Sequence, residues 1–487
     1  MLIMLGNWIV EGNIKNKIIS FWNNKPAFVL SSLLIMHFIG LIYTHNFNDA
    51  YLDLRIKVPL FVLPLLISTT APLPQNLFNS ILKLFIASVI FSTIISTLVL
   101  TGVIYRPIVD MRGISIFISH IRFALLICVS IFTSGYFIKI SANIFLKIMW
   151  SLIILWFILF LILMESLTGI SVLLITSFIL LLYKIFTLKS NIKKYATLTL
   201  IAAGLLFTVL YIREIINDRN NNIEIVDFHK LEKFTAHGNE YMHGTGSKLR
   251  ENGHLIWLYV CDKELKEVWN KRSTMDYEGE DKKGNSLRST LARFLSSKGL
   301  RKDGDALSSL SDSEIKAVER GETNVNYQNI SSLKGRIYET LWEIDLYKTN
   351  GDANGHSLTQ RFEYWKVAVN IIKDNFLIGV GTGDVQDSFD EYYIKMKSKL
   401  APKWRLHSHN QYLSIAVAFG LIGLLWFLFT LFYPVIKLKM TFDYLYITFF
   451  IIALISFFNE DTLETQAGVT FYSFLNSFLL FARKKDD

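Results

Sequence analysis

The chain has 487 residues, of which 52% are apolar or aromatic and 19% are charged. A soluble globular domain usually has about 25% charged residues, so the composition excludes an ordinary soluble protein of this length. The net charge of +9 does not indicate a nucleic-acid partner, because residues 213–410 contain 30 basic and 30 acidic residues. The positive excess lies in the apolar remainder of the chain and therefore predicts membrane topology.

Apolar runs near the length that crosses a bilayer as a helix, about 20 residues, occur on both sides of this neutral segment. We expect ten spans, approximately at residues 26–43, 57–70, 80–103, 117–138, 144–165, 168–187, 196–212, 411–434, 443–458 and 467–482. The second span contains Pro59 and Pro64 and is expected to be kinked. The sequence thus predicts an all-α polytopic membrane protein in three parts: 1–212 with about seven spans, a large, mostly helical loop domain at 213–410, and 411–487 with about three spans and a short cytoplasmic tail.

Basic residues outside the loop domain predict the orientation, since Lys and Arg are enriched in short cytoplasmic loops. With a cytoplasmic N-terminus, 15 of these 20 residues lie inside. The five that lie outside, on the same face as the loop domain, are Arg55, Lys57, Arg106, Arg112 and Arg122. Four of them are arginines, which grip phosphate or carboxylate through paired hydrogen bonds. We therefore expect an anion site on the outer face, with structural ion pairs as the alternative for any single arginine.

Two helices are marked within the loop domain. Ser311 and Glu314 form a capping box, and Gly321 follows as a stop signal. Residues 357 and 360 form a second capping box before a helix that is expected to end at Gly379. Its apolar stripe consists of Leu358, Phe362, Trp365, Val369, Ile372 and Phe376. This stripe predicts packing on the membrane domain or at the lipid surface, with a domain-core helix as the alternative.

The next motif is Gly379–Asp384, which reads GVGTGD. It lacks the Lys-Ser/Thr pair of a phosphate loop and follows a helix instead of a strand. We therefore predict a turn and no nucleotide. Gly420 and Gly423 in the eighth span are expected to permit close helix approach.

The segment His407-Ser408-His409-Asn410 directly precedes the eighth span. An H-x-H pair without a third clustered ligand does not predict a metal site. The positive end of the helix dipole disfavours a protonated imidazole, so His409 is expected to be neutral and able to act as a general base. The alternative role is interfacial hydrogen bonding. The connection between the last two spans adds Glu460, Asp461 and Glu464 on the same face, and ionisable groups that gather there are functional candidates.

These motifs resemble the signature of the O-antigen ligase and O-antigen polymerase superfamily of bacterial inner-membrane proteins. The resemblance runs from Arg361-x-x-x-Trp365 through the GVGTGD turn to His409-Asn410, and then over nine residues to Gly420-x-x-Gly423. The order of spans, late outer loop and basic tail agrees with it. It implies a GT-C-like fold with about ten to twelve transmembrane helices, a multi-pass inner-membrane location and an active site that faces the periplasm.

The resemblance also implies an activity. Ligases of this kind transfer polysaccharide from an undecaprenyl-diphosphate-linked glycan to a sugar hydroxyl of lipid A-core, in lipopolysaccharide biosynthesis, without a metal, a nucleotide sugar or another cofactor. His409 corresponds to the catalytic histidine, and Arg361 is expected to bind the diphosphate. Arg122 and Arg213 are expected to share that task, because the family's arginine at the turn before the loop is replaced by residues 166–169. The supporting residues are expected to be Asn410, Trp365 and Glu460.

Other functions remain open from the sequence. A repeat-unit polymerase or a protein O-oligosaccharyltransferase of the same superfamily would share the donor and differ in the acceptor. A polytopic transporter is the alternative from another class, although internal repeats and polar sites at the membrane midplane, which are typical of transporters, are not evident. The predicted partners are the lipid-linked donor, lipid A-core and membrane lipids, with no nucleic acid.

Overall fold

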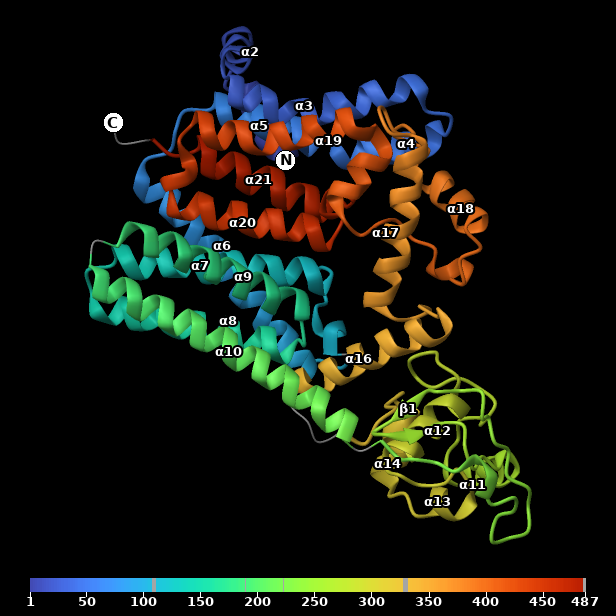
Figure 1. Cartoon of the computed structure of the whole chain (residues 1–487). Helices are drawn as coiled ribbons and strands as arrows, with labels where there is room; N and C mark the ends of the chain where they lie inside the picture. The colour runs from blue at the N-terminus through green and yellow to red at the C-terminus, as the bar shows by residue number, and fades with distance from the viewer. Residues whose placement is uncertain (107–110, 189, 222, 327–331, 485–487) are drawn as a thin grey trace. The chain divides into compact units, whose positions relative to one another are not determined.

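The computed structural model describes residues 1–106, 111–188, 190–221, 223–326 and 332–484 (Figure 1). The chain divides into two compact units. The first unit consists of Met1–Arg106, Arg112–Lys184 and Ala353–Asp487, and the second consists of Ile185–Asp352 with a short stretch before Arg112. The boundaries of the compact units therefore differ from those of the predicted loop domain, 213–410. The segment 353–410 belongs to the same unit as most of the apolar helices.

The first unit is built from helices. They are α1 (Leu2–Val10), α2 (Ile14–Asn23), α3 (Lys25–Gly40), α4 (Phe47–Lys57), α5 (Pro59–Thr69), α6 (Gln75–Leu100), α7 (His120–Ile140), α8 (Ile144–Leu163), α9 (Leu167–Thr187), α17 (Ser357–Asp374), α18 (Val385–Lys395), α19 (Gln411–Lys437), α20 (Tyr444–Asn459) and α21 (Gln466–Phe481), with the short 3-10 turn η6 (Thr462–Glu464) before α21. Helix α3 packs on α5 and α19, and α5 packs on α21. Helix α20 packs on α7, which packs on α8, as Figure 1 shows.

The predicted spans differ from the helices in length. Seven helices in the described part of the chain are long and apolar enough to cross a membrane: Lys25–Tyr43, Gln75–Leu100, His120–Ile140, Ile144–Leu163, Leu167–Ile185, Asn191–Asn217 and Gln411–Lys437. The other three predicted spans form helices of 11 residues (α5), 16 residues (α20) and 16 residues (α21). Each is shorter than the roughly 20 residues that span a bilayer. The all-α, multi-pass character is confirmed, and the count of ten stays a prediction.

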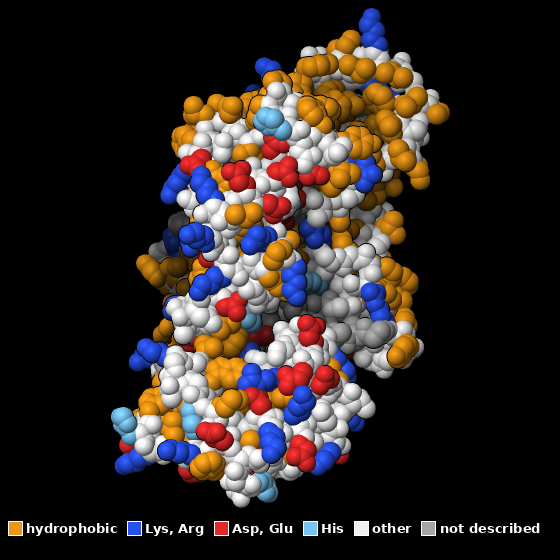
Figure 2. Space-filling model, turned by 90° about the vertical axis from the view of Figure 1, so that its right-hand side faces the viewer, with side chains coloured by type: hydrophobic (Ala, Val, Ile, Leu, Met, Phe, Trp, Pro, Cys, Tyr) orange, Lys and Arg blue, Asp and Glu red, His pale blue; other side chains and the backbone are white. Residues whose placement is uncertain are grey.

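The outward-facing side chains of several of these helices are apolar. On α6 and α8, for example, Leu84, Phe91, Phe145 and Leu152 are all more than half exposed. In Figure 2 hydrophobic side chains cover broad areas of the face shown, apart from the areas where Lys, Arg, Asp and Glu gather. A contiguous apolar surface of this kind suits contact with lipid.

Helix α19 is broken at Gly420, which has a φ of +62°. Four backbone hydrogen bonds close the break: Val380 and Gly381 donate to Val417 and Ala418, and Leu421 and Ile422 donate to Phe376 and Leu377. The turn that follows α17 thus satisfies the backbone groups that the break frees, as a nonaqueous surrounding requires. The GVGTGD segment is a turn, as predicted, and it docks α17 on α19. Gly420 permits this docking because a Cβ there would lie 2.3 Å from the Leu377 carbonyl carbon.

Helix α17 differs from its prediction at both ends and in its buried face. Its N-cap is His356 and no side chain caps it, so the second capping box is wrong, and the helix ends at Asp374, before the expected stop at Gly379. The buried face contains Tyr364, Val367 and Ile371. The predicted stripe is partly exposed, at Phe362, Val369 and Phe376. The polar residues Thr359, Gln360 and Glu363 are buried as well, so the buried face of α17 differs from the predicted apolar stripe.

The second unit has its own core. Its helices and strands are α10 (Asn191–Asn221), β1 (Arg250–Glu251), β2 (His254–Leu255), α11 (Asp262–Arg272), α12 (Leu287–Ser297), α13 (Gly304–Ser308), α14 (Asp312–Glu319) and α16 (Ser332–Asn350), and the two strands pair antiparallel. Buried side chains of the segments from β2 to α14, including Trp269, Tyr277 and Phe294, form the core cluster. The capping box of Ser311 and Glu314 is confirmed at the start of α14.

Candidate active site

The loop that carries His409 ends where α19 begins. Asn410 is the N-cap of α19, and its side-chain oxygen accepts a hydrogen bond of 3.1 Å from the Leu413 amide. Its side-chain amide donates to the Phe458 carbonyl oxygen at 3.1 Å. Asn410 therefore fixes the helix start and joins it to the end of α20. His409 precedes the cap with a φ of +47°, a backbone conformation that is uncommon for residues other than glycine.

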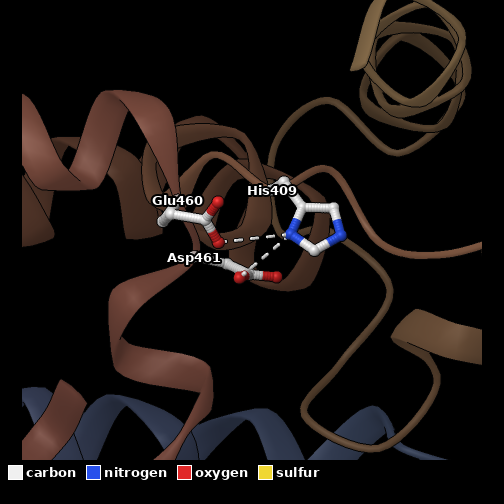
Figure 3. A group of neighbouring side chains, drawn as sticks. All are labelled: His409, Glu460 and Asp461. Carbon is white, nitrogen blue, oxygen red and sulfur yellow. Dashed lines mark ion pairs between the residues drawn. The ribbon is translucent and has the colours of Figure 1, made fainter. Parts of the chain in front are cut away.

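Two adjacent carboxylates face His409 from the connection between α20 and α21 (Figure 3). His409 Nδ1 lies 3.4 Å from Glu460 Oε2 and 3.6 Å from Asp461 Oδ1. These are ion-pair distances, longer than a close hydrogen bond. The carboxylates are at least 90% buried, and the imidazole is 31% exposed. The other ring nitrogen, Nε2, points away from both acids in Figure 3.

Helix α17 supplies two further groups to the site. Arg361 NH2 lies 2.7 Å from Glu460 Oε1, on the opposite oxygen from the one that faces His409. Trp365 Nε1 donates to the Ser408 carbonyl oxygen at 2.9 Å, which holds the histidine loop against α17. The structure thus brings together five predicted residues, which are Arg361, Trp365, His409, Asn410 and Glu460.

The protonation state of His409 is the opposite of the sequence expectation. Burial lowers the pKa of the imidazole, but the adjacent carboxylates of Asp461 and Glu460 outweigh burial and raise the pKa to about 9. The prediction that the helix start keeps His409 neutral is therefore wrong. A helix dipole acts as only about half a charge at the helix end, whereas two carboxyl groups lie within 3.6 Å of the ring.

The remaining predicted residues are Arg122 and Arg213, together with the alternative metal ligand His407. Arg122, in the first turn of α7, donates to Ser119 Oγ at 2.9 Å and has a buried Nε without a hydrogen-bond partner. Arg213 is exposed on α10 and belongs to the second unit. His407 packs near Phe389 and is not part of the cluster around His409. The role of Arg122 and Arg213 at the diphosphate stays a prediction.

Two neighbours of His409 received no role from sequence reasoning. Asp461 was noticed only as one of several acids on the outer face, although its adjacency to Glu460 in a short connection was a usable signal. The Tyr364 ring lies 5.5 Å from the imidazole. It sits beside Trp365 in the sequence, but the helix period alone does not indicate which of the two faces the histidine.

The donor set of this cluster also suits a cation in principle. His409, Glu460 and Asp461 offer three ligand atoms within 4.8 Å of one another, and one nitrogen with carboxylate oxygens is a common ligand set. Arg361 already takes one oxygen of Glu460, and a protonated His409 adds a second positive charge. Protein cations therefore balance the two carboxylates, and the absence of a metal from the reaction stays our prediction.

A comparison with protein families matches residues 310–428 to the family described as O-Antigen ligase. The matched segment contains α17, the GVGTGD turn, the His409 loop and the first part of α19. This match confirms the predicted resemblance and supports a member of the O-antigen ligase and polymerase superfamily, whose members are glycosyltransferase-like enzymes. A comparison with curated proteins finds no match.

Proposed function

We propose that this member of the O-antigen ligase and polymerase superfamily is an O-antigen ligase that transfers polysaccharide from undecaprenyl diphosphate to a lipid A-core hydroxyl at the periplasmic face of the inner membrane. The observation that carries this proposal is the arrangement of His409, Glu460, Asp461 and Arg361 within and beside the family-matched segment. It provides a base, acids that stabilise the charged form of the base, and a guanidinium at one site.

The proton is taken by His409. In the reactive form Nδ1 carries a proton toward Glu460 and Asp461, and Nε2 has a free lone pair that faces away from them (Figure 3). The acceptor hydroxyl gives its proton to Nε2 as its oxygen attacks the anomeric carbon. The two carboxylates stabilise the imidazolium that forms, which is the role of the aspartate in a Ser-His-Asp triad.

The leaving group is the lipid diphosphate. As the bond between the anomeric carbon and the diphosphate oxygen breaks, the electron pair leaves with that oxygen, and negative charge grows on the diphosphate. Arg361 can stabilise this charge with paired donors in a partly buried place. Direct displacement by the acceptor oxygen inverts the anomeric centre. The side chain of Arg361 is 23% exposed, so a ligand can reach it.

The experiment is transfer of undecaprenyl-linked glycan to purified lipid A-core by the purified protein, with His409→Ala as the inactive control. Product with the wild type and none with the variant supports the proposal. A wild type that is inactive with this acceptor, but elongates a lipid-linked repeat unit, assigns the protein to the polymerase alternative. The polysaccharide profile of a deletion strain separates the same two functions, because loss of a ligase removes all long chains and loss of a polymerase leaves a single repeat unit attached.

A further inference from the structure

A buried ion network lies beside the candidate active site. The Lys57 side chain, at the end of α4, is fully buried. Its Nζ lies 2.7 Å from Asp53 Oδ1 and 2.5 Å from Glu464 Oε2. Asp53 also has His37 Nε2 at 3.8 Å. The sequence predicts Lys57 on the outer face with four arginines, and the structure gives it two carboxylate partners.

Gln411 connects this network to the start of α19. Its side-chain amide donates to Glu464 Oε1 at 2.8 Å, and its side-chain oxygen accepts from the Leu463 amide at 2.7 Å. Gln411 follows Asn410, which holds the Phe458 carbonyl oxygen. The N-cap of α19 and its first residue therefore bind the end of α20 and the far end of the connection that carries Glu460 and Asp461.

A side-chain contact also joins this connection to α20. The hydroxyl groups of Ser456 and Thr462 lie 2.6 Å apart. Lys57 is the one cation within hydrogen-bonding distance of Glu464 among the described residues. Its ammonium keeps the pKa of Glu464 below the ordinary value although burial raises it. Glu464 is therefore charged, and it is bound by Lys57 through one oxygen and by Gln411 through the other.

We propose that Lys57 is a positioning residue for the transfer reaction: through Glu464 and Gln411 it holds the connection 459–465 so that Glu460 and Asp461 face His409. This inference rests on the proposed function, because its kinetic consequence requires the transfer activity. Lys57 touches neither His409 nor Arg361 in any contact of the described residues, so its effect passes through the acidic connection.

The buried charge is physically suited to this task. Taking a lysine and two carboxylates out of water has a desolvation penalty that the pairing only partly offsets, so such a network is a weak source of stability. The hydrogen bonds of the network are directional, however, because the Lys57 ammonium donates to one oxygen of Asp53 and one of Glu464. An apolar contact of similar volume would allow the connection to slide, and a shift of about 1 Å in a catalytic group can reduce the rate by as much as 10²-fold.

The test compares Lys57→Met with Lys57→Arg, Glu464→Gln and the matched control Lys437→Met, which removes an exposed lysine from α19. Each variant is measured for membrane abundance, kcat and KM in the transfer assay. We expect Lys57→Met and Glu464→Gln to lower kcat by about ten- to a hundredfold with the donor KM nearly unchanged. Lys57→Arg keeps the charge and recovers most of kcat, and Lys437→Met resembles the wild type.

A double-mutant cycle separates positioning from a general structural role. In the Glu460→Gln, Asp461→Asn background, Lys57→Met is expected to cause no further loss of kcat, because the groups that it positions have already lost their charge. An additive loss in that background overturns the proposal. So does full kcat in abundant Lys57→Met and Glu464→Gln proteins.

Hydrogen exchange gives a readout that does not require activity. In Lys57→Met the amides of residues 459–465 are expected to exchange faster, with the core of the second unit unchanged as an internal reference. Unchanged exchange in 459–465 overturns the positioning role whatever the activity. A wild type that fails to transfer glycan to any acceptor overturns the proposed function instead, while faster exchange in 459–465 still supports the structural part of this inference.

Discussion

Two charged clusters meet in the short connection between α20 and α21, and they are built differently. Around Lys57 the ion pairs are 2.5 and 2.7 Å long and the cation is fully buried. Around His409 the contacts to the acids are 3.4 and 3.6 Å long and the ring is 31% exposed. Glu460 belongs to the His409 cluster and Glu464 to the Lys57 cluster, and only three residues lie between them in the sequence.

The difference indicates separate tasks for the two clusters. Short contacts to a fully buried cation leave no room for a substrate, so the Lys57 cluster is suited to holding structure. Longer contacts and an exposed ring edge leave His409 able to meet a hydroxyl group, so this cluster is suited to chemistry. Charge alone does not distinguish them, since each contains two carboxylates. The following experiments test that distinction.

The largest expected effect is at His409. His409→Ala should lower transfer by about 10²–10⁴-fold, the usual contribution of a general base, while membrane abundance is preserved. His409→Gln should be equally slow, because glutamine forms hydrogen bonds but does not take the proton. His407→Ala is the matched control and should be mild. Transfer of undecaprenyl-linked glycan to lipid A-core, normalised to folded protein, measures all three, and an active His409→Gln variant removes the general-base role.

The next effect is at the arginines. Arg361→Lys should lower transfer by about tenfold or more with normal abundance, because lysine cannot supply paired donors to the diphosphate. Arg122→Lys and Arg213→Lys are expected to impair transfer as well. Competition by inorganic pyrophosphate should weaken in any variant whose arginine binds the diphosphate. Full activity of all three lysine variants would contradict the diphosphate role and favour the alternative that these arginines form structural ion pairs.

A smaller effect is expected on thermal stability, where variants of the Lys57 cluster and of the His409 cluster should differ. Glu464→Gln should lower the Tm of the detergent-solubilised protein by several degrees, since it leaves the buried ammonium of Lys57 with one carboxylate partner. Asp461→Asn should change Tm much less, because its contact to the half-buried His409 is long and Glu460 remains. Intrinsic tryptophan fluorescence during heating measures both. Equal losses in the two variants would mean that the clusters share the structural task.

The sequence named residues that the structure brings together, although it misplaced several helix boundaries. The family resemblance indicated His409 and Arg361, and the connection between the last two spans added Glu460. The structure places these three side chains in contact, and their role in an active site stays a prediction. Gly420 was identified as a special position, but its role as a helix break depends on the backbone of residues 376–381, which contacts it from outside α19. The hydropathy of α19 does not indicate that residues 376–381 pair with its backbone.

Two features depended on tertiary contacts that no local pattern encodes. The apolar stripe of α17 was expected to be its buried face. In the structure Gln360 and Glu363 are buried instead, and Glu363 accepts a hydrogen bond from Ser398. The pairing of Lys57 with Glu464 joins residues 407 positions apart. The prediction of a neutral His409 is wrong for the same reason, since its carboxylate partners follow two intervening helices, α19 and α20.

The smallest expected effect is a shift in pH dependence, and it follows from the pKa of about 9 at His409. A base must be neutral to act, so kcat/KM should rise with pH up to about 9, whereas an unperturbed histidine would level off near 6.5. Asp461→Asn removes one carboxylate and should move the midpoint downward. Glu464→Gln should move it in the same direction, because it loosens the connection that carries Glu460 and Asp461, while Lys437→Met, which removes an exposed lysine, should leave it in place.

The stability contribution of the same group has the opposite dependence on pH. The pairing of protonated His409 with Glu460 and Asp461 stabilises the fold fully below the unfolded pKa, and this contribution is lost as the pH rises through about 9. The wild type should therefore lose a little thermal stability across the range in which its activity increases, and His409→Gln should not show that loss. A midpoint near 6.5 in the wild type, or one that Asp461→Asn leaves in place, would contradict the role of the two carboxylates at His409.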